Sequence, residues 1–157
     1  MDFTKSLIEN DSIALNVEAN DWKEVIQKSV QPLIDSKAVT QQYVEEIIKS
    51  TEKFGSYYIL LDRFAMPHAR PDNSYIKKDS FSFIILKKPV FFPDDQPVEF
   101  LACLAATSKE THLGESLPQI ATIFSDKSIF DELKEAQTKE EILKIFNKRK
   151  DNNDWNK

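Results

Sequence analysis

The sequence predicts an α/β protein in which helices cover a central β-sheet. Short apolar runs, typical of buried strands, alternate along the chain with longer segments of helical spacing. The 157 residues suit a single domain, and a hydrophobic fraction of 41% is enough for a core. Charged residues make up 30% of the chain and mix both signs, which is typical of a globular protein and not of a disordered one.

The first part of the chain alternates strand and helix signals. Apolar residues at every second position indicate strands, whereas spacings of three and four indicate helices. Capping residues and glycine then give the helix ends. The expected elements are a strand over 12–17, a helix capped by Asn20-Asp21 that runs to about Ser36 with a disturbance at Pro32, a helix from Thr40 to Gly55, and a buried strand over 57–61.

The remainder of the chain begins with a stiff segment, because Pro67 and Pro71 prevent a continuous helix over 64–71. The expected elements that follow are a strand over 81–86, a proline-rich turn over 88–95, a strand over 98–105, a helix from Glu110 to Phe124, a short helix over 127–133, and a final helix that Thr138 starts. We expect residues 1–148 to form one domain and residues 149–157 a polar, frayed C-terminal tail.

Composition excludes several classes of function. The net charge is −5 and the pI about 5.1, and no basic patch dominates, so a nucleic-acid partner is not expected. The two glycines, Gly55 and Gly114, are too few for the glycine-rich loops that bind nucleotides, and no cofactor is expected. The N-terminus does not resemble a signal peptide, and no apolar run approaches the ~20 residues that span a bilayer. We therefore expect a cytoplasmic protein.

Cys103 is the single cysteine and lies in the apolar run 100–106. One cysteine cannot form an internal disulfide and offers no zinc-ligand spacing, so no metal site is expected. We interpret Cys103 as a small buried residue and not as a reactive thiol.

His68 is the first candidate for chemistry. It follows a predicted buried strand and lies between Pro67 and Pro71, so its backbone is restricted. A neutral imidazole is nucleophilic near pH 7 and can accept a phosphoryl group on one nitrogen, while a hydrogen bond to the other fixes the tautomer. Arg70 lies two positions along the same extended segment, so we expect it on the same side, where it could neutralise phosphoryl charge.

His112 is the second candidate, at the start of the helix expected from Glu110. A helix N-terminus favours the neutral imidazole, which could then donate one hydrogen bond to a phosphoryl oxygen. Thr111 and Ser116 are interpreted first as a helix cap and a solvated residue, although both could donate to phosphate. Glu110 and Glu115 would repel phosphate, so we expect them to face away.

The segment Ala65-Met66-Pro67-His68-Ala69-Arg70-Pro71-Asp72 resembles the phosphorylation site of enzyme IIA domains of the sugar phosphotransferase system, mannitol and fructose class (type 2). The residues around His68 are most similar to the ascorbate-specific branch. Further similarities follow in the same order along the chain, at Lys88-Pro89-Val90-Phe91, Pro97-Val98, Thr111-His112-Leu113 and Glu140-Glu141-Ile142-Leu143, so the resemblance covers about residues 5–147.

The resemblance implies a phosphotransferase that is itself phosphorylated, with a single mixed β-sheet flanked by helices on both sides. Such a protein accepts a phosphoryl group from the carrier protein HPr on the histidine matching His68. It passes this group to a cysteine of enzyme IIB, from which it reaches a sugar entering through the membrane enzyme IIC, here L-ascorbate or a related sugar. The histidine matching His112 is implied to lie beside the active one and to support its phosphorylated state.

Two departures from the family pattern bear on the site. Asp62-Arg63-Phe64 replaces a small glycine-containing turn, and we interpret Arg63 as a surface residue, with added positive charge at the site as the alternative. The helix before the active-site strand carries Lys49, Glu52 and Lys53, so an arginine of the mannitol branch has no clear counterpart.

Two alternative functions remain open from the sequence. The chain could be a regulatory enzyme IIA-like module of a transcription regulator, in which phosphorylation is a signal. It could also be an unrelated α/β protein in which His68 and His112 are structural or, with carboxylates, bind a metal.

Overall fold

The computed structural model describes residues 1–152, apart from the side chains of Leu113, Asp151 and Asn152. A five-stranded mixed sheet in the order β1-β5-β6-β3-β2 forms its centre. The pairs β1–β5 and β3–β6 are parallel, whereas β5–β6 and β2–β3 are antiparallel. The strands are β1 (Ile13–Val17), β2 (Ile59–Leu61), β3 (Arg63–Ala65), β5 (Phe83–Phe92) and β6 (Gln96–Leu101), and the 3₁₀ turn η1 (Pro93–Asp95) joins the last two.

A short antiparallel pair, β4 (Ser80–Phe81) with β7 (Leu104–Ala105), lies just beyond the β5–β6 pair. Ser82 and Cys103 lie between the two pairs of strands, and Ser82 donates its backbone N–H to the Cys103 carbonyl at 3.0 Å. The strand expected over 98–105 is therefore divided into β6 and β7, and the two short strands prolong the central antiparallel pair toward the histidine segments.

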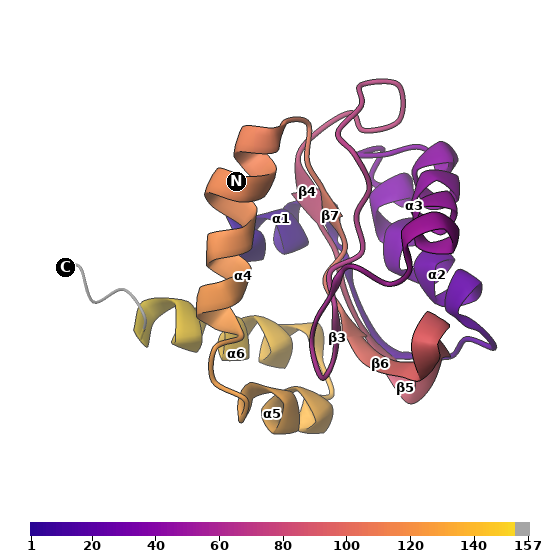
Figure 1. Cartoon of the computed structure of the whole chain (residues 1–157). Coiled ribbons are helices and arrows are strands. Elements are labelled where there is room, and N and C mark those ends of the chain that lie inside the picture. Colours follow the sequence, from indigo (N-terminus) through magenta and orange to yellow (C-terminus); the bar gives the residue numbers. More distant parts are fainter. Residues whose placement is uncertain (153–157) are drawn as a thin grey trace.

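Helices cover both faces of the sheet, as the resemblance implied (Figure 1). Helices α2 and α3 pack on one face, and α1, α4, α5 and α6 pack on the other. The helices are α1 (Phe3–Asn10), α2 (Trp22–Asp35), α3 (Gln41–Phe54), the π-helix η2 (Glu110–Ser116), α4 (Leu117–Ile123), α5 (Ile129–Glu135) and α6 (Lys139–Asn152).

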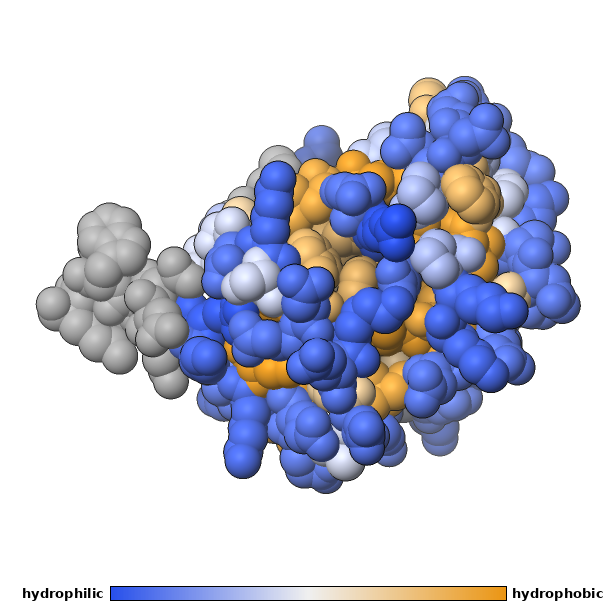
Figure 2. Space-filling model, turned by 90° about the horizontal axis from the view of Figure 1, so that it is seen from below, coloured by the Kyte–Doolittle hydropathy of each residue, from blue (hydrophilic) through white to orange (hydrophobic). Residues whose placement is uncertain are grey.

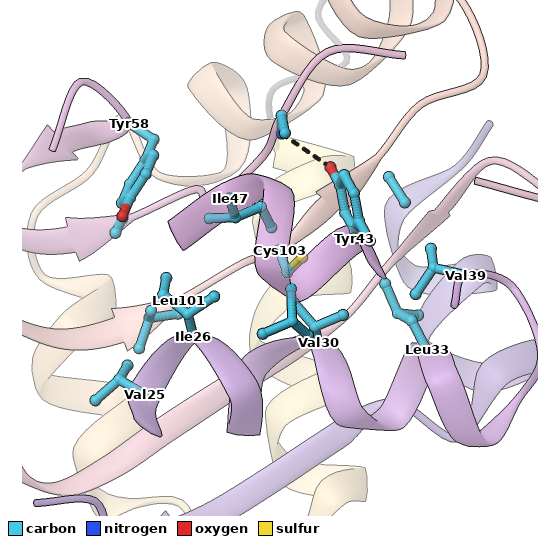
Figure 3. Close-up of a cluster of buried hydrophobic side chains, with 14 of the residues drawn as sticks. Val25, Ile26, Val30, Leu33, Val39, Tyr43, Ile47, Tyr58, Leu101 and Cys103 are labelled. Carbon is cyan, nitrogen blue, oxygen red and sulfur yellow. Dashed lines mark hydrogen bonds between the residues drawn. The ribbon is translucent and has the colours of Figure 1, made fainter. Parts of the chain in front are cut away.

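The two faces have different cores. Aliphatic side chains of α2 and α3 meet the sheet on one face, and Tyr43 and Cys103 are buried among them (Figure 3). The other core is largely aromatic, and Phe124 stacks on Phe64 with ring centroids 4.3 Å apart. Both cores anchor the strands whose ends carry the site.

Helix α1 was not predicted from the sequence. Asp2 caps it by accepting the Lys5 backbone N–H at 3.0 Å, and Phe3 and Leu7 are buried in the aromatic core. The helix has only two buried apolar residues, since Ile8 is exposed, which is too few for helical spacing to stand out. Tertiary packing rather than pattern therefore stabilises this helix.

Two strand predictions need correction. Strand β2 forms an edge of the sheet, and Leu60 and Leu61 are 40% and 37% exposed, so the buried strand expected over 57–61 is wrong. The strand expected to end before Lys88 continues as β5 to Phe92. Pro89 is tolerated there because pairing with β1 ends at Leu86 and the register with β6 shifts between Ile85 and Val90.

The C-terminal helix extends further than expected. Helix α6 continues to Asn152, and Arg149, expected in the frayed tail, is only 5% exposed. Its guanidinium pairs with Glu132 of α5 and, at 3.5 Å, with Asp126. The remainder of the expected tail, residues 153–157, lies outside the described part of the chain.

Most of the face seen in Figure 2 carries hydrophilic side chains, with apolar surface showing between them. Within residues 1–152, none of the helices has the length and apolar character needed to cross a membrane.

Candidate functional site

The His68 segment leaves the end of β3 and is fixed by neighbouring elements on both sides of the histidine. Leu104 of β7 donates its N–H to the Pro67 carbonyl at 3.0 Å, and Ala69 donates its N–H to the Tyr43 hydroxyl at 3.1 Å, the dashed line in Figure 3. The same Tyr43 hydroxyl donates to the Leu104 carbonyl. One strand and one helix therefore hold the backbone directly before and after His68.

The His68 ring has one nitrogen engaged by the backbone. Its Nδ1 lies 2.7 Å from the Met66 carbonyl oxygen. A carbonyl can only accept a hydrogen bond, so Nδ1 carries the proton and Nε2 keeps its lone pair. This is the tautomer that a nucleophile attacking through Nε2 requires.

His112 lies beside this ring, at the start of η2. The ring centroids are 4.5 Å apart and the planes cross at 85°, an edge-to-face contact. The structure thus brings together the two histidines that the sequence singled out. The backbone N–H of His112 donates to the Ser108 carbonyl at 3.2 Å. His112 lies within a π-helix, a form often found at functional sites.

Burial keeps both imidazoles neutral. It lowers the pKa of His68 from its ordinary value to about 4, against the opposing effect of the Met66 carbonyl and with a smaller contribution from His112. Burial also lowers the pKa of His112. A ring that is unprotonated at neutral pH has a lone pair available for reaction.

Tyr57 is a site residue that the sequence did not indicate. Its hydroxyl donates to the His68 backbone carbonyl at 2.6 Å, and its ring meets the imidazole edge to face at 5.4 Å. It is 44% exposed, so it flanks the histidine at the surface. The apolar run over 57–61 predicts a buried strand that includes Tyr57, and nothing in its spacing distinguishes Tyr57 from Tyr58.

Arg70 is exposed, and the structure places it with Lys49 and Lys53 of α3 around a shallow depression next to the His68 segment. Its backbone carbonyl accepts a hydrogen bond from the Tyr75 hydroxyl at 2.8 Å. Glu46 and Asp72 also line the depression, so its three cationic side chains stand beside two carboxylates. The small excess of positive charge favours the approach of an anionic group.

The hydroxyls near His112 differ from the expectations. Thr111 is buried and interacts with Ser108 and Asp79, and Ser116 is fully buried, so its interpretation as a solvated residue is wrong. Glu110 and Glu115 are exposed, and Glu115 pairs with the N-terminal amino group.

The remaining candidates take no part in the histidine pair. Arg63 is at the surface, as expected, and its Nη1 lies 3.5 Å from the buried carboxylate of Glu99, which Lys134 also contacts. Cys103 is buried, and burial raises the pKa of its thiol to about 12. Among residues 1–152 no cluster of three or more His, Cys, Asp and Glu side chains could hold a metal ion.

Comparisons with known proteins identify the family of the chain. The family model described as "Phosphoenolpyruvate-dependent sugar phosphotransferase system, EIIA 2" matches residues 6–149. An ascorbate-specific PTS system EIIA component from Salmonella choleraesuis is 37% identical over 150 residues, which are 94% of this chain and 97% of that protein.

Solved structures show the same fold. One described as a PTS IIA from Streptococcus mutans has a TM-score of 0.92 at 42% identity and covers 96% of both chains. The mannitol-specific cryptic phosphotransferase enzyme IIA from Escherichia coli has a TM-score of 0.76 at 30% identity, over 87% of this chain and 92% of that one. The chain therefore belongs to the type 2 enzyme IIA family of the phosphoenolpyruvate-dependent sugar phosphotransferase system.

Proposed function

We propose that this enzyme IIA accepts a phosphoryl group from phosphorylated HPr on Nε2 of His68 and passes it to a cysteine of enzyme IIB. The observation that carries the proposal is the pairing of Nδ1 with the Met66 carbonyl, which leaves Nε2 as the nucleophilic nitrogen. His112 beside the ring is the supporting donor.

In the first step the Nε2 lone pair forms a bond to the phosphorus of the donor. The donor's N–P bond breaks, and its electron pair returns to the donor nitrogen. The His68 ring gains positive character at Nδ1–H, and the Met66 carbonyl stabilises that charge by accepting a stronger hydrogen bond. No proton has to leave His68 before the attack, because burial already keeps the ring neutral.

In the second step a thiolate of the acceptor attacks the same phosphorus. An S–P bond forms, the Nε2–P bond breaks, and its electron pair returns to Nε2, which restores the neutral ring. Both steps need in-line placement and neutralisation of charge on the equatorial oxygens. We assign that neutralisation to a hydrogen bond from His112 and to the positive charge of Arg70.

The sugar is the finer part of the proposal. The Met-Pro-His-Ala-Arg-Pro sequence over 66–71 and the 37% identical relative named ascorbate-specific favour L-ascorbate or a related sugar. The membrane enzyme IIC then takes part indirectly, because enzyme IIB carries the phosphoryl group to the sugar. We place the protein in the cytoplasm, where its protein partners would meet it.

The test is phosphorylation of the purified protein by phosphoenolpyruvate, enzyme I and HPr. We expect one added phosphoryl group, labile in acid, on the wild type and none on His68→Ala. His112→Ala is expected to be labelled but to transfer about 10²-fold more slowly, the usual cost of removing one donor to a developing negative charge. Labelling of His68→Ala to the wild-type level would contradict the assignment.

A third variant separates chemistry from folding. Lys88→Ala removes an exposed charge from β5 and is expected to behave as the wild type in both transfers. Thermal unfolding of all four proteins shows whether a loss of transfer follows a loss of structure. The genes next to the coding sequence give an independent check, since neighbouring enzyme IIB and IIC genes of an ascorbate system favour the sugar assignment.

A further inference from the structure

Asp79 is the centre of a hydrogen-bond network that the histidine site leaves unexplained. Its Oδ1 accepts the Thr107 backbone N–H at 2.6 Å and the Thr107 hydroxyl at 2.9 Å. Its Oδ2 accepts the Thr111 hydroxyl at 3.4 Å. One carboxylate thus contacts both the beginning of the loop after β7 and the residue next to His112.

The loop has its own links to the same residues. Ser108 Oγ accepts the Thr111 backbone N–H at 3.1 Å and donates to the Thr111 hydroxyl at 3.2 Å. The Ser108 carbonyl accepts the His112 backbone N–H at 3.2 Å. The first turn of η2 is therefore fixed by the Ser108 and Thr111 side chains as well as by a backbone bond.

The network starts from a defined point of the fold. Asp79 directly precedes β4, and Thr107 follows β7 with one residue between, so the carboxylate spans the end of the β4–β7 pair. The same strand β7 holds the other histidine, because Leu104 donates to the Pro67 carbonyl. Each histidine segment is thus hydrogen-bonded to the β4–β7 pair. The His68 segment is bound through Leu104, and the His112 segment through Asp79.

We propose that Asp79 is a positioning residue for phosphoryl transfer: it fixes the loop 107–111 on β7 and so holds His112 against the His68 ring. The inference rests on the function proposed above. A carboxylate that accepts several hydrogen bonds from one loop restricts that loop far more than a single neutral bond does. The contact that Asp79 would maintain is the one between the His68 and His112 rings, whose centroids are 4.5 Å apart.

A double-mutant cycle tests the proposal with the full chain, enzyme I and HPr. Asp79→Ala alone is expected to slow phosphoryl transfer by about tenfold, within the loss that a 1 Å displacement can cause. In the His112→Ala background the same change is expected to alter the rate by less than about twofold, because a residue that acts through another has no separate effect. The conservative Asp79→Asn retains the acceptor for Thr107 and is expected to restore most of the rate.

The cycle separates positioning from general stability. A role in stability alone would lower the melting temperature and the transfer rate in both backgrounds, and additive rate losses would overturn the proposal. An unchanged rate in Asp79→Ala would also overturn it. If Asp79→Ala does not fold, Thr107→Val removes one of the three bonds and carries the same cycle, with a smaller loss in the wild-type background and none beside His112→Ala.

A second measurement needs no phosphoryl donor. The ¹⁵N and ¹H resonances of the two imidazole rings report their contact, and Asp79→Ala is expected to shift those of both rings, whereas Asp79→Asn leaves them close to the wild type. Ring resonances that do not move would overturn the positioning role. If the wild type accepts no phosphoryl group, the proposed function fails, and the ring resonances still decide whether Asp79 positions His112.

Discussion

The Nδ1 atom of His68 lies 2.7 Å from the backbone carbonyl oxygen of Met66, two residues earlier in the same segment. Because the acceptor belongs to the main chain, no protonation event can remove it, and the tautomer is set by the fold. Pro67 stands between the two residues and limits the backbone angles that produce this contact.

Stability is expected to fall as the pH is lowered through the range in which His68 titrates. Burial depresses the pKa of His68 to about 4 from an ordinary value of 6.5, so the unfolded chain binds this proton more readily than the folded one. The contribution of the neutral His68 ring to the free energy of unfolding is complete above about pH 6.5. It is lost as the pH falls toward 4, and the loss reaches up to about 3 kcal/mol. Urea unfolding at several pH values measures it, and His68→Gln should show a shallower dependence. Equal slopes for both proteins would contradict this prediction.

Tyr57→Phe is expected to slow phosphoryl transfer severalfold while costing about 1 kcal/mol of stability or less, because it removes one half-exposed hydrogen bond to the His68 carbonyl. Tyr58→Phe is the matched control, since the Tyr58 hydroxyl is buried and bonds to Thr51. The control should lower the melting temperature more and the transfer rate less. The reverse order in the two measurements would show that Tyr57 does not support the site.

Arg70→Ala is expected to reduce the rate of labelling about tenfold if the guanidinium neutralises phosphoryl charge, since charge-assisted hydrogen bonds contribute about 1.5–3 kcal/mol. Arg70→Lys should keep part of the rate, because it preserves the charge but not the planar geometry. The rates are measured at two salt concentrations, and screening should weaken a purely long-range effect. A wild-type rate for Arg70→Ala would remove this residue from the site.

Phe124→Ala is expected to destabilise the protein by about 3–5 kcal/mol, because it opens a cavity in the aromatic core between the sheet and α4. Phe54 is 66% exposed, so Phe54→Ala serves as the control and should change stability by less than about 0.5 kcal/mol. The free energy of unfolding in urea compares the two, and similar losses would refute the assignment of Phe124 to the core.

Cys103 is expected to resist alkylation in the folded protein. The thiol is fully buried, and burial raises its pKa to about 12, so almost no thiolate exists at pH 8. Iodoacetamide should modify it only in denaturant, as mass spectrometry would show. Rapid modification without denaturant would mean that this part of the core opens readily.

Long periodic segments were predictable from the sequence. Helices α2 and α3 begin and end within about a residue of the expected limits, because Asp21 and Gly55 mark their ends and the apolar spacing is continuous between. The two histidines were also predictable as candidates, since a proline-flanked His68 is unusual. Their contact was not, because pairing across the fold leaves no periodic signal, and the family resemblance supplied it.

The features that the sequence did not predict all depend on contacts between segments far apart along the chain. The exposure of β2 depends on its place at the edge of the sheet, and the continuation of β5 through Pro89 depends on where its neighbours end. The hydrogen bonds of Tyr57 and Asp79 are made to groups that the fold brings close, the His68 carbonyl for Tyr57 and Thr107 and Thr111 for Asp79. A single sequence gives the chemistry of such residues but not what they face.

The position of the phosphoryl group on the His68 ring tests the central claim most directly. The protein is labelled with phosphoenolpyruvate, enzyme I and HPr, and long-range ¹H–¹⁵N correlation spectra of the imidazoles then identify the substituted nitrogen. We expect phosphorus on Nε2 of His68, with the proton retained on Nδ1. Phosphorus on Nδ1 of His68, or on His112, would contradict the account.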